Sequence, residues 1–316
     1  EIEGQILQNK SEDRPLALYH FYRFFYGNHG YGNPELGTQH SIKTITNGDI
    51  IDFYSRYFGA KTITVMGSGA ADKSAIEDWV QKVTEKLSAL HPEAEAPAPF
   101  TKPVIPEGRR ALISNKPTTQ TQILMGATGM RPEDPGFYAV QLANYTFGGP
   151  SFNARLMTEI RVKRGWTYGA SNTFRFGKQP RHFAMHMFPK TADTVPAIGL
   201  TIKLFEDFVK NGITDEEFTF ARDSLVNNSP FNFDTPKKRI DNATTEYLTS
   251  FPKGYFRNFA DNIDRVSKSD VAPALKSFFK PANLTLLVLG DASKLRDPIS
   301  KLPGFSKPVV KNYLEE

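Results

Sequence analysis

Residues 148–169 read GGPSFNARLMTEIRVKRGWTYG and carry the clearest local pattern in the chain. A glycine-rich loop comes first. Leu156 and Ile160 then stand four positions apart, as on one face of a helix, and Gly165 is placed to end that helix. The residues after it favour a strand over 166–174. This stretch therefore predicts a loop, a helix and a strand in succession.

The residues around this stretch alternate between strand-like and helix-like patterns. We expect strands within 111–125 and 182–188 and helices over 135–147, 195–210 and 214–227. The last helix begins with a capping box, in which Glu217 follows Thr214 by three positions. Because helices and strands are interspersed along the chain, the predicted fold class is α+β.

A proline-rich segment divides the chain. Residues 91–108 read HPEAEAPAPFTKPVIPEG, and five prolines exclude a regular helix or a central strand. We expect this segment to run extended over the surface as a linker. It separates a front piece, residues 1–90, from a back piece, residues 109–316.

The two pieces share an internal repeat. Residues 45–65 read ITNGDIIDFYSRYFGAKTITV, and residues 266–286 read VSKSDVAPALKSFFKPANLTL. Aligned on Asp49 and Asp270, each copy has a capping residue, an amphipathic helix and an apolar strand. The repeat indicates duplicated domains. The first copy has about 114 fewer residues ahead of it, so we expect its domain to be truncated at the N-terminus.

Composition excludes several classes of protein. The chain has 316 residues, of which 39% are hydrophobic, and this excludes a mainly disordered protein. The absence of cysteine excludes disulfides, thiolate metal sites and a cysteine nucleophile. No apolar run approaches the roughly 18 residues of a membrane span. The chain opens on Glu1 rather than Met, which is compatible with removed residues upstream.

The net charge of +5 gives little support to nucleic-acid binding. The densest basic stretch comprises Arg155, Arg161, Lys163 and Arg164, with Glu159 among them. No nucleic-acid-binding motif accompanies it, so we interpret it as a solvated helix face.

Arg161 and Tyr168 are the candidate chemical pair. A guanidinium can hold the carbonyls or carboxylates of an extended peptide, and a phenol can donate to an oxyanion. The alternative is that Arg161 is a helix-end cation and Tyr168 a half-buried strand residue.

The stretch 148–169 resembles the signature of the C-terminal half of M16 peptidases, the pitrilysin-type or inverse zincin family. The resemblance rests on Arg155-Leu156, Ile160-Arg161 and the Tyr168 that follows. Two further segments resemble the family, YGNPELGTQHSIKTI at 31–45 and GITDEE at 212–217. The chain is thereby similar to the zinc-less, Arg/Tyr-bearing part of such enzymes.

The resemblance implies duplicated α/β domains, with mostly antiparallel sheets flanked by helices, that close around an unfolded peptide substrate. It implies that Arg161 and Tyr168 are catalytic and bind substrate. Gly148, Gly149 and Ser151 would form the substrate-facing loop, and Ser151 is also a plausible N-cap. A zinc-bearing M16 subunit or domain would be the partner, and a bacterial periplasmic setting is expected.

The family's zinc motif, His-x-x-Glu-His, is absent. His182 and His186 have the spacing of a helical zinc pair, but on a strand they would lie about 13 Å apart. Glu1 and Glu3 lie near the register of the family's third zinc ligand. We expect no metal in this chain, zinc in the partner, and no peptidase activity from the chain alone.

Two other functions stay open at this point. The chain could be an inert M16-like scaffold subunit of a larger complex, or a basic nucleic-acid-binding module.

Overall fold

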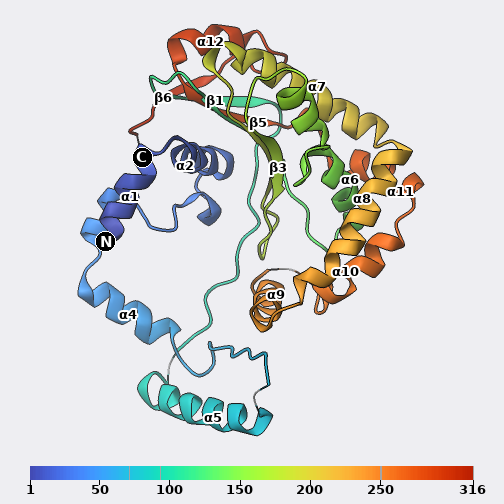
Figure 1. Cartoon of the computed structure of the whole chain (residues 1–316). Coiled ribbons are helices and arrows are strands. Elements are labelled where there is room, and N and C mark those ends of the chain that lie inside the picture. The colour runs from blue at the N-terminus through green and yellow to red at the C-terminus, as the bar shows by residue number, and fades with distance from the viewer. Residues whose placement is uncertain (71, 93, 250, 316) are drawn as a thin grey trace.

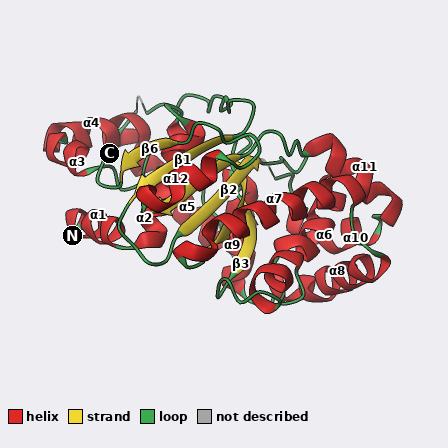
Figure 2. Cartoon of the chain, turned by 90° about the horizontal axis from the view of Figure 1, so that it is seen from above, coloured by secondary structure: helices red, strands yellow, loops and turns green. Residues whose placement is uncertain are grey.

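A computed structural model describes residues 1–70, 72–92, 94–249 and 251–315. A six-stranded sheet forms its centre, with helices on both faces (Figures 1 and 2). The strands are β1 (Arg110–Asn115), β2 (Gln122–Thr128), β3 (Ala170–Phe174), β4 (His182–Met187), β5 (Thr285–Gly290) and β6 (Val309–Asn312).

The strand order is β3-β4-β2-β5-β1-β6. The pairs β3/β4, β4/β2 and β2/β5 are antiparallel, whereas β5/β1 and β1/β6 are parallel. The prediction of an α+β fold with a mostly antiparallel sheet is therefore confirmed. The predicted strand region 111–125 is two strands, because residues 116–121 leave the sheet between β1 and β2.

One face of the sheet carries the main core. Side chains alternate across a strand, so Leu286 and Val288 of β5 point to this face. It is covered by helices of the back piece, of which α6, α7 and α11 pack against one another. The helices of this piece are α6 (Phe137–Gly148), α7 (Thr194–Asn211), α8 (Asp215–Asn228), α9 (Pro236–Leu248), α10 (Tyr255–Asp264), α11 (Lys268–Phe278) and α12 (Ala292–Ser300).

The opposite face of the sheet is covered from the front piece. Leu287 and Leu289 of β5 pack against α2, whose Phe21 and Phe25 are buried there. The front piece contains α1 (Ile2–Ser11), α2 (Asp13–Tyr26), α3 (Gln39–Thr44), α4 (Asn47–Tyr57) and α5 (Lys73–Leu90). Figure 1 shows α4 and α5 standing apart from the sheet, whereas α2 lies against it.

The helices of the internal repeat, α4 and α11, both form. Each begins with a capping box, Thr46 with Asp49 and Ser267 with Asp270. The predicted strand after the first copy is wrong, because the described residues 61–70 form no strand. The equivalent β5 is paired between β1 and β2, whereas no strand of the described residues pairs with residues 61–66.

The two copies of the repeat differ sharply in burial. In the second copy, Val271, Leu275, Phe279 and Leu284 are at most 2% exposed. The equivalent positions of the first copy are between 40% and 58% exposed: Ile50, Tyr54, Phe58 and Ile63. We refer to these four residues as the α4 surface.

Three of the predicted helices form close to the expected positions, at α6, α7 and α8. The Thr214–Glu217 capping box of α8 is present, with both reciprocal hydrogen bonds. Among the described residues, no helix is both long enough and apolar enough to cross a membrane.

Candidate functional site

The helix predicted within 148–169 is largely a π-helix, η2 (Met157–Val162). Its wider turns are shown by the amide of Lys163, which donates to the carbonyl of Thr158, five residues earlier, at 2.9 Å. Gly165, at φ +66°, then reverses the chain, and the amide of Trp166 donates to the carbonyl of Ile160 at 3.2 Å. π-Helical turns are frequent at functional sites.

Ser151 is not the N-cap of this helix. Its hydroxyl accepts the amide of Asn153 at 3.2 Å in a local turn, and the first helical acceptor is the carbonyl of Ala154. The three intervening residues close the turn before the helix begins. The structure thus places Ser151 in the loop ahead of the helix, without a helix-capping hydrogen bond.

Gly148 and Gly149 lie at the end of α6. Gly148 is buried, and a Cβ there would stand 2.6 Å from Nδ2 of Asn172. A Cβ on Gly149 would stand 2.7 Å from the carbonyl oxygen of Tyr145. A Cβ on Gly149 would therefore press on backbone atoms, whereas one on Gly148 would need the side chains of Asn172 and Leu156 to shift.

Most of the basic stretch is neutralised locally. Lys163 and Arg164 both bind the Glu159 carboxylate, at 2.5 and 2.8 Å. Their hydrogen bonds, that of Lys163 foremost, lower the pKa of Glu159. Arg155 instead reaches across to α8, where it binds Glu217 through two hydrogen bonds of 2.7 and 2.6 Å.

Arg161 differs from these three cations. Within the described residues, its side chain has no ion pair and no hydrogen bond. Its guanidinium instead lies over the ring of Phe152, 5.2 Å from the centroid, and the Phe152 side chain is 68% exposed. A cation over an aromatic face is held electrostatically while its N–H groups stay available.

Tyr168 lies in the loop before β3 and not in a strand, because β3 begins only at Ala170. The neighbouring Thr167 is buried, and its hydroxyl accepts the amide of Phe188 at 3.2 Å. This anchor leaves Tyr168 pointing outward, 78% exposed. The structure thus places Arg161 and Tyr168 on either side of the Gly165 reversal, and both can be reached from solvent.

The two strand histidines do not fit a zinc site. Nδ1 of buried His182 is 2.7 Å from the hydroxyl of Tyr26, and Nε2 of His186 is 3.0 Å from Oε1 of Gln122. Burial, helped by nearby arginines, lowers the pKa of His182 to about 3 and that of His186 to about 4. Among the described residues, no group of three or more histidines and carboxylates could hold a metal, and Glu1 and Glu3 are exposed at α1.

Sequence reasoning missed Phe152. It follows the glycines by three positions, and a lone aromatic residue in a loop carries no pattern that would single it out. Its importance becomes visible only through its contact with Arg161.

Comparisons with known proteins agree with this architecture. A family model described as the peptidase M16 inactive domain matches residues 44–225. A Helicobacter pylori protein named as the non-peptidase homolog YmxG is 20% identical, over 93% of this chain and 67% of its own length. An uncharacterized zinc protease of Streptomyces coelicolor is 26% identical, over 68% of this chain but only 48% of its own length.

A solved structure of a peptidase M16 inactive domain from Pseudomonas fluorescens has the same fold. It superposes with a TM-score of 0.78 at 21% identity, covering 92% of this chain and 68% of that one. The chain thus spans between about half and two thirds of these similar proteins. Because the model of the peptidase M16 inactive domain matches more than half of its residues, the chain belongs to the M16 peptidase family.

Proposed function

We propose that this chain is the substrate-binding, zinc-less part of an M16-type peptidase and that it supplies Arg161 and Tyr168 to a zinc-bearing subunit or domain. The observation that carries the proposal is the state of Arg161. Of the four cations in the basic stretch, it alone lacks a carboxylate among the described residues. A cation without a carboxylate partner, seven positions before an exposed phenol, suits a substrate better than it suits the fold.

The proposed chemistry divides between the two parts. The zinc-bearing partner generates the hydroxide that attacks the peptide carbonyl. Arg161 donates hydrogen bonds to a substrate carbonyl and orients the peptide. Tyr168 donates its phenolic hydrogen to the oxyanion that forms when the carbonyl becomes tetrahedral, and this lowers the barrier to cleavage.

The α4 surface supports the existence of such a partner. In the second copy of the repeat, the equivalent residues are buried by α6, α7 and the strands next to β5. We infer that the zinc-bearing part covers Ile50, Tyr54, Phe58 and Ile63 in the same manner. Exposed apolar faces are otherwise a liability in water.

The test is a peptidase assay on the chain assembled with its zinc-bearing partner, using an internally quenched, unstructured peptide. Tyr168→Phe is expected to lower kcat by about 10²–10³. Assembly and melting temperature should stay unchanged because Tyr168 is exposed. Tyr247→Phe, at another exposed tyrosine, is the matched control. An unchanged kcat for Tyr168→Phe contradicts the proposal.

The second candidate is an inert M16-like scaffold subunit. It is favoured by the name of the Helicobacter pylori relative, a non-peptidase homolog. A scaffold would still use the α4 surface for assembly, whereas substitutions of Arg161 and Tyr168 would change neither assembly nor peptide cleavage. The same assay therefore separates the two candidates. The nucleic-acid module is disfavoured, because Glu159 and Glu217 neutralise most of the basic stretch.

A further inference from the structure

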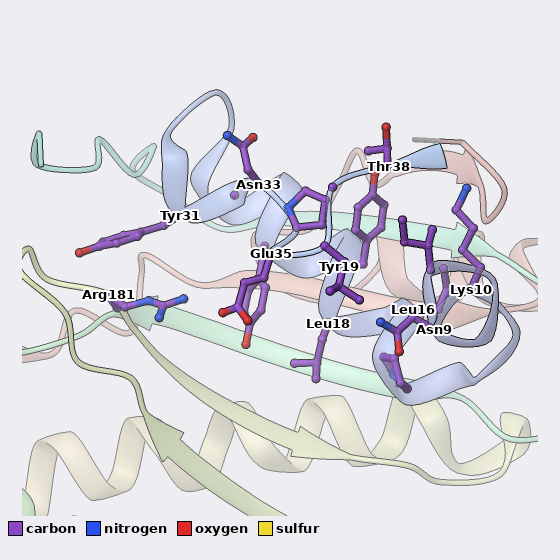
Figure 3. A pocket seen from close by; sticks show the side chains of 17 residues that line it. Asn9, Lys10, Leu16, Leu18, Tyr19, Tyr31, Asn33, Glu35, Thr38 and Arg181 are labelled. Atoms are coloured by element: carbon purple, nitrogen blue, oxygen red, sulfur yellow. The ribbon is translucent and has the colours of Figure 1, made fainter. Parts of the chain in front are cut away.

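A cavity of about 460 Å³ lies between α1, α2 and the loop of residues 31–38 (Figure 3). Its size falls in the range of pockets that bind small molecules. Most of its wall is apolar or aromatic, including Leu16, Leu18, Tyr19, Tyr22 and Leu36. It contains neither Arg161 nor Tyr168, so it is a separate feature from the proposed peptidase site.

Arg181 supplies a cation to this cavity. It directly precedes β4, and its guanidinium stacks on the ring of Tyr31 at 4.8 Å. Tyr31 is itself fixed, because its hydroxyl accepts the amide of Gln179 at 3.1 Å. Nε of Arg181 is shielded from solvent and has no hydrogen-bond partner in the described chain. A shielded donor without a partner is uncommon and points to a missing acceptor.

Glu35 supplies an anion to the same cavity. It lies in the turn before α3, and Figure 3 shows its carboxylate and the guanidinium of Arg181 directed toward one another at the cavity. The two residues form no ion pair with each other within the described part of the chain. Lys10 also lines the cavity, but its ammonium group already donates to Oε1 of Gln39 at 3.1 Å. Arg181 and Glu35 are therefore the charged pair that the cavity offers to an occupant.

We propose that this cavity binds a small zwitterion with an aromatic or branched apolar side chain, that is, a free amino acid or a dipeptide. The ligand carboxylate accepts hydrogen bonds from Arg181, and its ammonium group donates to Glu35. The side chain packs on the tyrosines and leucines of the wall. A simple anion would be repelled by Glu35 and a simple cation by Arg181, whereas a zwitterion satisfies both.

The site is tested by isothermal titration of the whole chain, without any partner, using four probes. Phenylalanine and the dipeptide Ala-Phe carry both charges, phenylalanine amide lacks the carboxylate, and N-acetyl-phenylalanine lacks the ammonium group. At least one zwitterion is expected to bind saturably, and comparing the two decides between a free amino acid and a dipeptide. Each singly charged probe should bind about tenfold or more weakly.

Variants assign each charge to its residue. In Arg181→Met, phenylalanine and its amide should bind equally weakly. In Glu35→Gln, phenylalanine should lose its advantage over N-acetyl-phenylalanine. Arg257→Met and Glu107→Gln are exposed controls that should bind as the parent does.

Glu35 is exposed, so its variant keeps the test valid even if Arg181→Met disturbs the fold. The proposal is overturned if neither zwitterion binds saturably. It is also overturned if the parent binds all four probes alike, or if Glu35→Gln leaves the discrimination against the N-acetyl probe intact.

Discussion

The guanidinium of Arg161 lies 5.2 Å from the ring centroid of Phe152. Within the described chain, the Arg161 side chain forms no hydrogen bond and no ion pair, so this cation–π contact is the interaction that holds it. Phe152 precedes the π-helix and Arg161 lies near its end, so the loop and the helix together fix the cation. The contact orients Arg161 without occupying its hydrogen-bond donors. Phe152 is thus a positioning residue for Arg161.

Phe152→Leu is expected to weaken peptide binding and to leave the fold intact. An exposed cation–π contact contributes about 0.5–1 kcal/mol, so the KM of the assembled peptidase should rise about two- to fivefold. The value of kcat should change less, because Arg161 keeps its charge. The measurement is a comparison of KM and kcat with an internally quenched peptide.

Phe231→Leu is the matched control, because this phenylalanine is 63% exposed at a different place on the surface. Its KM should equal that of the parent. Equal KM values for Phe152→Leu and Phe231→Leu would show that the Phe152 contact has no role in holding Arg161.

The sequence predicts those elements whose signals are local. The capping boxes at Thr46, Thr214 and Ser267 all form, since each depends on residues only three positions apart. The apolar run of β5 also forms, because strands on both sides and helices on both faces bury it. Local chemistry and tertiary packing agree at these places.

The predictions that fail depend on distant parts of the chain. Residues 61–65 have a strand's composition, but a strand requires a neighbouring strand, and in the part of the chain that the structure describes none pairs with them. Ser151 has the right chemistry for a cap, but the turn that it forms with Asn153 delays the helix. Neither the neighbour nor the turn can be deduced from residue type alone, and the same holds for the Phe152 contact.

The internal repeat allows a matched pair of substitutions. Leu275→Ala removes a fully buried side chain and should destabilise the isolated chain by about 2–5 kcal/mol. The equivalent Tyr54→Ala alters a residue that is 47% exposed and should change stability by less than about 0.5 kcal/mol. Urea unfolding of both variants measures the difference.

Tyr54→Ala also tests the α4 surface in assembly. Tyr54→Ala should weaken association with the zinc-bearing partner, whereas exposed Leu248→Ala, on α9, should leave it unchanged. Association of Tyr54→Ala with parental affinity would mean that the partner docks elsewhere.

The ion pair between Arg155 and Glu217 is expected to stabilise the contact between α8 and the helical turn that leads into η2. Burial opposes ionisation of Glu217, but hydrogen bonds from Arg155 and from the amide of Thr214 outweigh it and lower its pKa. Glu217→Gln should therefore lower the free energy of unfolding by about 1–2 kcal/mol at pH 7. The loss is no larger because both side chains are partly exposed and solvent screens their charges. The exposed Glu77→Gln should cost less than about 0.5 kcal/mol.

The pH dependence of this contribution has a definite sign. A carboxylate whose pKa is lowered by folding stabilises the protein above its unfolded pKa, here 4.5, and the stabilisation is lost as the pH falls through the folded value. Parent and Glu217→Gln should thus differ at pH 7 and converge below pH 4.5. A difference in unfolding free energy that stays constant down to pH 3 would contradict the assignment.

The buried histidines should make the fold sensitive to milder acid. Folding lowers the pKa of His182 to about 3 and that of His186 to about 4, from 6.5. Both are therefore neutral in the folded chain at pH 5, whereas the unfolded chain binds protons at both. The stabilisation that comes from keeping these histidines neutral is fully present above pH 6.5. As the pH falls from 7 to 5, the free energy of unfolding should decline by about 1–2 kcal/mol for each histidine.

His182→Gln isolates one of these two contributions. Glutamine can accept a hydrogen bond from Tyr26 but does not titrate, so the variant should lose less stability than the parent between pH 7 and pH 5. Any loss of stability that the substitution causes at every pH cancels, because each protein's free energy of unfolding at pH 5 is compared with its own value at pH 7. If urea unfolding gives the same loss for both proteins, then His182 does not stay neutral in the folded chain.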